Sequence, residues 1–152
     1  MTLAFSPEKK DRTRQEKMDE VEIKMLYSNT VTFYEHWSGI LMNGNLVLPY
    51  CDNMWKYKDM IFGVLPETTL ESFSYTSTYY EDHFHCFQNF PPSLKIIELA
   101  NWRGVSTQTI DKLIAQDVEC HHQYELPFSE SGVPVYDDTQ TYKLEDGYWL
   151  KL

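Results

Sequence analysis

The chain has 152 residues, a net charge of -10 at pH 7 and a pI near 4.8, and 42% of its residues are hydrophobic and 15% aromatic. This apolar content excludes a disordered chain, and no apolar stretch approaches the roughly 18 residues that a membrane-spanning helix needs. The strong negative charge opposes binding to a phosphate backbone and favours a basic protein surface as the partner.

The negative charge is unevenly distributed along the chain. Residues 1–28 contain six acids and six bases, whereas the other 124 residues contain 17 acids and 7 bases. Between Asp117 and Asp146 there are eight acids and one base, Lys143. We therefore predict one folding unit with two parts, a charged N-terminal helix or arm over residues 1–28 and an acidic α+β domain over residues 29–152.

The N-terminal part is predicted to form a helix over about residues 7–27. Ser6 is a suitable N-cap, and a proline and an acid follow it in the first turn. Four apolar residues recur at helical spacing and form a narrow stripe: Met18, Val21, Met25 and Leu26. The stripe suits either docking on the body or a homo-oligomer formed through this helix.

The remaining elements are mainly strands. They are predicted at 30–34, at 39–42 and 46–48 around Asn43-Gly44-Asn45, within 73–87, at 94–99, at 119–128, and at 142–144 and 148–150 around Glu145-Asp146-Gly147. Residues 54–65 fit a strand or a short helix, and Ser106 caps a second helix over about 106–117. These elements predict a single α+β domain with a largely antiparallel β-sheet.

One alternative function is DNA binding. Residues 99–113, with Ala100, then Gly104-Val105-Ser106, then Ile110 and Leu113, resemble the core of bacterial helix-turn-helix regulators. The resemblance implies that Thr107, Gln108 and Lys112 face the DNA groove. The flanks are acidic, however, and residues 94–99 have the pattern of a strand where that family has a helix, so we do not predict nucleic acid as the main partner.

Another alternative is a zinc site or a zinc enzyme. His83 and His85 share one face of a strand, and together with Cys120 and His122 they would supply a tetrahedral set of ligands. The spacing follows no standard zinc motif, and packed histidines and cysteines give the same pattern. The main prediction is therefore that the protein uses no cofactor.

No catalytic motif is present in the sequence, whether a phosphate-binding loop, a nucleophile elbow or a metalloprotease helix. The adjacent Glu35 and His36 would suit an acid–base pair, but nothing in their spacing requires one. We predict no catalytic residues. An odd number of cysteines and the lack of a signal-peptide pattern predict a cytoplasmic protein.

The acidic C-terminal region is the predicted docking surface. Its acids and aromatic anchors are Asp137, Asp138, Glu145, Asp146, Tyr136, Tyr142, Tyr148 and Trp149. Residues 144–151, LEDGYWLK, resemble the DGYW hairpin repeats of small phage- and prophage-borne accessory proteins of the Rhs/YD kind. The resemblance implies a mobile-element origin and an inhibitor of host or defence machinery in a bacterial cytoplasm. We predict a non-enzymatic protein-binding module, anti-CRISPR-like in role, that inhibits or modulates a basic nucleic-acid-handling or defence complex.

Overall fold

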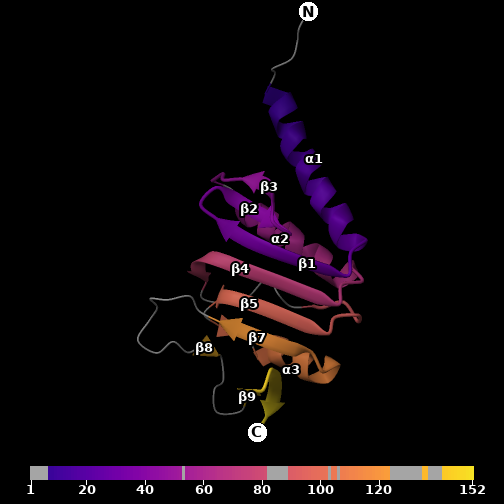
Figure 1. Ribbon diagram of the computed structural model, residues 1–152, viewed down its shortest axis with the longest axis vertical. Helices are drawn as coiled ribbons and strands as arrows, with labels where there is room; N and C mark the ends of the chain where they lie inside the picture. The colour runs from indigo at the N-terminus through magenta and orange to yellow at the C-terminus, as the bar shows by residue number, and fades with distance from the viewer. Residues whose placement is uncertain are drawn as a thin grey trace, which may run out of the picture.

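The computed structural model describes residues 7–52, 54–81, 89–102, 104–105, 107–123, 135–136 and 142–152 (Figure 1). In chain order the elements are α1 (Pro7–Leu26), β1 (Thr30–His36), β2 (Gly39–Met42), β3 (Asn45–Pro49), α2 (Met54–Val64), the 3-10 helix η1 (Leu65–Glu67), β4 (Ser72–Glu81), β5 (Ile96–Trp102), β6 (Gly104–Val105), α3 (Thr107–Gln116), β7 (Glu119–Gln123), β8 (Val135–Tyr136), β9 (Tyr142–Glu145) and β10 (Tyr148–Lys151). None of the helices in these ranges is long and apolar enough to cross a membrane.

Most elements lie where the local sequence predicts them. The N-terminal helix, the helix after Ser106 and both hairpins are confirmed, and residues 54–64, which fitted either a strand or a helix, form α2. The predicted strand residues 82–87 and 124–128 lie outside the described residues. Both hairpins turn through two residues with positive φ, at 51° and 86° for Asn43-Gly44 and at 52° and 88° for Asp146-Gly147. This is the type I′ geometry, whose twist matches that of the flanking strands.

The main sheet is mixed, with strand order β3-β2-β1-β4-β5-β7. The predicted antiparallel arrangement holds for β3, β2 and β1, but it is wrong for β1, β4, β5 and β7, which all pair in parallel. Parallel neighbours need a long crossover, and α2 supplies one between β1 and β4 while α3 supplies one between β5 and β7. The fold therefore keeps the predicted α+β class with a mixed sheet.

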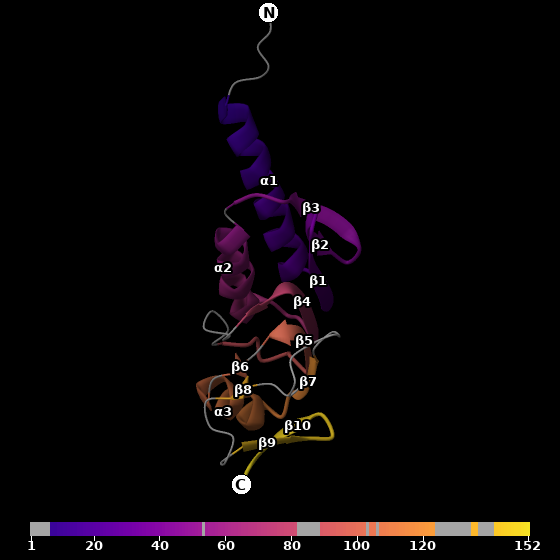
Figure 2. The ribbon, with the colours of Figure 1, turned by 90° about the vertical axis from the view of Figure 1, so that its left-hand side faces the viewer.

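The order of the parallel strands determines which face of the sheet the helices cover. Each new strand is added on the same side of the one before, and crossovers of this kind are almost always right-handed. Two such crossovers in the same direction place their helices on the same face, and Figure 2 shows α2 and α3 together on one side of the strands. The opposite face, which Figure 1 shows from the front, carries no described helix.

The core lies between the sheet and these helices. Phe33 and Phe73 on the sheet are fully buried, and their ring centroids are 6.0 Å apart; Phe62 of α2 packs within 5.9 Å of Phe73 and 5.6 Å of Tyr75. Burying side chains of this size stabilises the fold by about 1.5–3 kcal/mol each. The buried apolar residues that α2 contributes to the core are Met54, Tyr57, Ile61, Phe62 and Val64.

Helix α1 docks on this core through its C-terminal half. Val21 and Met25 are buried, and Met18 and Leu26 pack against the core, so the predicted apolar stripe is confirmed. Helix α1 contacts α2 and β3. Towards its N-terminal end, α1 extends away from the strands (Figure 1).

The C-terminal hairpin covers the edge of the sheet next to β7. Trp149 is buried, the Tyr142 hydroxyl donates a 2.6 Å hydrogen bond to Asp111 Oδ1 of α3, and the Cys120 amide donates a 2.6 Å hydrogen bond to the Gly147 carbonyl. An isolated two-stranded hairpin is marginal in water, so these contacts with α3 and β7 hold it in place.

Candidate functional site

The face of the main sheet opposite α2 and α3 is covered by none of the described helices. Along β1 the side chains alternate between exposed and buried, and the exposed ones, among them Thr32 and Tyr34, point away from the helices. Parallel sheets are ordinarily covered on both faces. Here no described element lies over this face of β1, β4, β5 and β7, which makes it the candidate binding surface.

The strand register arranges polar residues in rows across this face. Thr32 pairs with Ser74, Ser74 with Glu98, and Glu98 with His121, so one row crosses four parallel strands. Because neighbouring strands lie about 4.8 Å apart, consecutive side chains in the row are neighbours.

The next row of this face is less polar. Tyr34 pairs with Thr76, and Thr76 pairs with Ala100. The small side chain of Ala100 on β5 therefore stands beside the larger Thr76 of β4.

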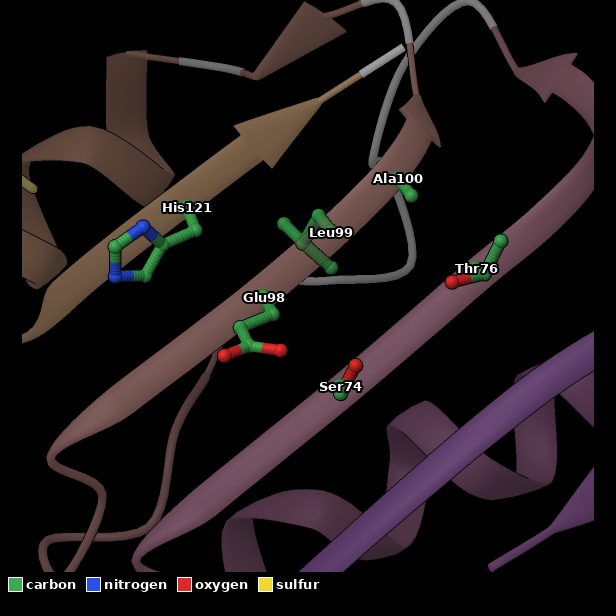
Figure 3. Close-up of a pocket in the computed structure, with 6 residues that line it drawn as sticks. All are labelled: Ser74, Thr76, Glu98, Leu99, Ala100 and His121. Carbon is green, nitrogen blue, oxygen red and sulfur yellow. The ribbon is translucent and has the colours of Figure 1, made fainter. Parts of the chain in front are cut away.

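A hollow of about 110 Å³ lies over β4, β5 and β7 (Figure 3). Its lining residues are Ser74, Thr76, Glu98, Leu99, Ala100 and His121. The Glu98 side chain is exposed, and Ser74 and Thr76 are half-buried. The lining thus combines a carboxylate, two hydroxyls and an imidazole, and it contains no Lys or Arg.

A second carboxylate lies beside the hollow. His121 Nε2 is 3.4 Å from Glu119 Oε2, two residues away on the same face of β7. The turn of the C-terminal hairpin adjoins Glu119, since a Cβ added at Gly147 would lie 3.0 Å from Glu119 Cγ. The negative potential at this edge of the hollow therefore comes from two side chains, Glu98 and Glu119.

Glu35 and His36 do not form the acid–base pair that their adjacency suggested. Glu35 is an inward residue of β1 and is 2% exposed, whereas His36 is on the open face, 5.8 Å from the Tyr34 ring. Glu35 Oε2 instead lies 2.9 Å from Lys58 Nζ of α2, and the Ser77 hydroxyl donates to the same oxygen at 3.4 Å. This buried ion pair joins the sheet to α2 and does not reach the hollow.

The predicted C-terminal docking residues divide into three groups. Tyr142 and Trp149 are buried, which corrects their assignment as surface anchors, because a two-stranded hairpin must pack one face to be stable. Glu145, Asp146 and Tyr148 are exposed. Tyr136 belongs to β8, and Asp137 and Asp138 lie outside the described residues.

The helix-turn-helix prediction is wrong in its geometry. Residues 99–102, which correspond to the motif's first helix, belong to strand β5, so Thr107, Gln108 and Lys112 of α3 lack the supporting helix that would set them in a groove. Lys112 Nζ instead donates a 2.7 Å hydrogen bond to Asn89 Oδ1.

The predicted zinc set stays a prediction. His83 and His85 lie outside the described residues, and His122 is at the register position opposite Leu99. Cys120 is buried on the helix-covered side. Within the part of the chain that the structure describes, no three His, Cys, Asp or Glu residues are grouped as metal ligands.

Cys120 is expected to be chemically inert. Burial raises the pKa of its thiol to about 11, and a hydrogen bond with Trp149 offsets this only in part. Against an ordinary thiol pKa of 9.0, this lowers the thiolate fraction at pH 8 about 100-fold. We expect iodoacetamide to alkylate Cys120 far more slowly than the half-buried Cys51 in a folded Cys86→Ser chain, and both equally in urea. Equal rates in the folded chain would contradict the burial of Cys120.

The comparisons with known proteins add no further guide to the site. No protein family, curated protein or solved structure was found that matches the chain. The candidate site therefore rests on the open face itself, with its hollow and its two carboxylates, and on the charge of the chain.

Proposed function

We propose that the chain is a non-enzymatic module that binds a basic protein surface through the open face of its sheet. The observation that carries this proposal is the parallel half of the sheet, whose face opposite α2 and α3 no described element covers and which presents Glu98 at its centre in a chain of net charge -10. A partner would complete the second layer that parallel sheets ordinarily have.

Exposed aromatic residues at one end of the same sheet support a protein partner. Trp37, in the turn between β1 and β2, is 82% exposed, and Tyr50, directly after β3, is 56% exposed. The Tyr50 amide donates a 2.8 Å hydrogen bond to the Ser38 carbonyl, which holds the two aromatic residues at the same end of the sheet. Tyr34 is partly exposed on the open face itself. Tyr and Trp are the side chains that most often anchor protein interfaces.

The class of partner follows from charge. Surfaces that hold nucleic acid are rich in Lys and Arg, and an acidic module attracts them while it repels nucleic acid. We therefore propose that the partner is a nucleic-acid-handling protein. The chain would inhibit it by occupying the basic surface that holds nucleic acid.

The test is affinity capture from a bacterial lysate, followed by native mass spectrometry, with the full chain and two charge-reversal variants. Glu98→Lys changes the open face, and Asp59→Lys makes the same charge change on the exposed side of α2. We expect a stoichiometric partner that duplex DNA displaces and that is lost as salt rises. It should be absent with Glu98→Lys and retained with Asp59→Lys.

Capture that does not respond to salt, or that both variants retain equally, would contradict the proposal. The circular dichroism spectra of the two variants control for folding. A partner lost equally with both variants would point to net charge rather than to the open face.

A further inference from the structure

The hollow on the open face offers hydrogen-bond acceptors and negative charge. Glu98 carries a carboxylate with two acceptor oxygens, and Ser74 and Thr76 carry hydroxyls that accept as well as donate. His121 adds an imidazole, and a carboxylate oxygen of its neighbour Glu119 lies 3.4 Å from the His121 Nε2. Lys95, directly before β5, pairs with Glu71, and their charged atoms are 2.8 Å apart.

These acceptors are arranged along the sheet rather than around a point. Ser74, Glu98 and His121 lie in one row across β4, β5 and β7, and Figure 3 shows their side chains along neighbouring strands. The small Ala100 leaves room beside Glu98 in the next row. Several acceptors spread along a row match a planar donor better than a compact one.

We propose that this hollow binds the guanidinium group of an arginine side chain, an inference that rests on the proposed function and names the group that the partner inserts. Guanidinium is planar and has five N–H donors in a fixed fork, so it can pair with the Glu98 carboxylate through two hydrogen bonds and still donate to a flanking hydroxyl. The ammonium of lysine has three donors around a point charge and fits the row less well. An anion is excluded by the two carboxylates.

The experiment uses the full chain, labelled with ¹⁵N, and follows amide chemical shifts by NMR. The probe is N-acetyl-arginine amide, and N-acetyl-citrulline amide is its neutral counterpart of nearly equal shape. We expect arginine to bind with a Kd on the order of 1–10 mM, as a single exposed site allows. The shifts should concentrate at residues 74–76, 98–100 and 121, and citrulline should leave them unchanged.

Two variants that each remove one negative charge show where the arginine probe binds. Glu98→Gln should raise the Kd about tenfold or abolish binding, because it removes the charge-assisted pair while keeping the shape. Asp59→Asn on α2 should leave the Kd unchanged. N-acetyl-lysine amide should bind more weakly than arginine. Equal shifts with citrulline, equal binding of lysine, or an unaffected Glu98→Gln variant would each overturn the assignment.

The two proposals fail separately. A salt-sensitive protein partner without arginine-specific shifts would leave the proposed function in place and remove the guanidinium site. Arginine-specific shifts that Glu98→Gln abolishes would keep the site even if no protein partner is captured, and the proposed function would then be wrong.

Discussion

Replacing Lys58 with methionine is expected to destabilise the fold by about 3–5 kcal/mol, because it removes the positive charge of Lys58 from a buried ion pair with Glu35. Both side chains are at least 95% buried, and their charged atoms are 2.9 Å apart. The Ser77 hydroxyl, at 3.4 Å from Glu35 Oε2, is neutral and does not replace the positive charge of Lys58. The measurement is urea unfolding at pH 7 followed by circular dichroism, with the midpoint and the slope fitted separately.

A double variant separates the charge from the packing. Glu35→Leu with Lys58→Met removes both charges of this pair, so we expect most of the lost stability to return. Lys95→Met is the control on an exposed pair, because the Lys95 side chain is 75% exposed and its pair with Glu71 should change the midpoint little. A Lys58→Met variant as stable as the parent, or a double variant as unstable as the single one, would contradict the account.

Features fixed by local chemistry could be predicted from the sequence. Both hairpins were predictable because their turns contain Asn43-Gly44 and Asp146-Gly147, which adopt the positive φ angles that a two-residue turn requires. The same holds for α1, whose stripe ending in Met25 and Leu26 is visible at helical spacing and does pack on the core.

The parallel register could not be predicted, because it depends on which strands meet after distant crossovers. Residues 54–65 are a short, largely apolar run whose pattern fits a strand as well as a helix. The local sequence therefore did not show that a helix, α2, connects β1 to β4. The row that joins Ser74, Glu98 and His121 exists only in that register, and the hollow was therefore missed. The alternation of Ser74 and Thr76 with Phe73 and Tyr75 was the available signal, since it predicts a hydroxyl-bearing face on this strand.

The burial of Glu35 and Trp149 was not predicted, for a related reason. Glu35 follows Val31 and Phe33 at the inward positions of one strand, which is itself a signal that its carboxylate is buried and paired. Its partner Lys58 is on another element, where the sequence pattern does not point to it. Trp149 was predicted as a surface anchor together with the acidic residues around it. A hairpin must bury one face to be stable, however, and tryptophan is the largest apolar side chain available for that face.

Replacing Gly39 with alanine is expected to destabilise the chain by at least about 3 kcal/mol, through backbone strain and a direct clash. Gly39 has a φ of 138°, which side chains rarely adopt, and an added Cβ would lie 1.8 Å from the Leu48 carbonyl oxygen and 2.9 Å from Pro49 C. These are backbone atoms of the paired strand β3, so no side-chain rotation relieves the contact. Thermal and urea unfolding measure the loss.

Gly63→Ala is the matched control, since the same methyl group there meets nothing within 4 Å and lies inside helix α2. It should stabilise the chain by about 0.5–1 kcal/mol, because alanine loses less backbone entropy than glycine in a helix. A loss of stability with Gly39→Ala and a gain with Gly63→Ala would show that the close approach of β2 and β3 causes the loss, and not the replacement of a glycine as such. A tolerated Gly39→Ala would mean that this hairpin is looser than its register indicates, and Trp37 in the adjoining turn would then be a poorly fixed anchor for a partner.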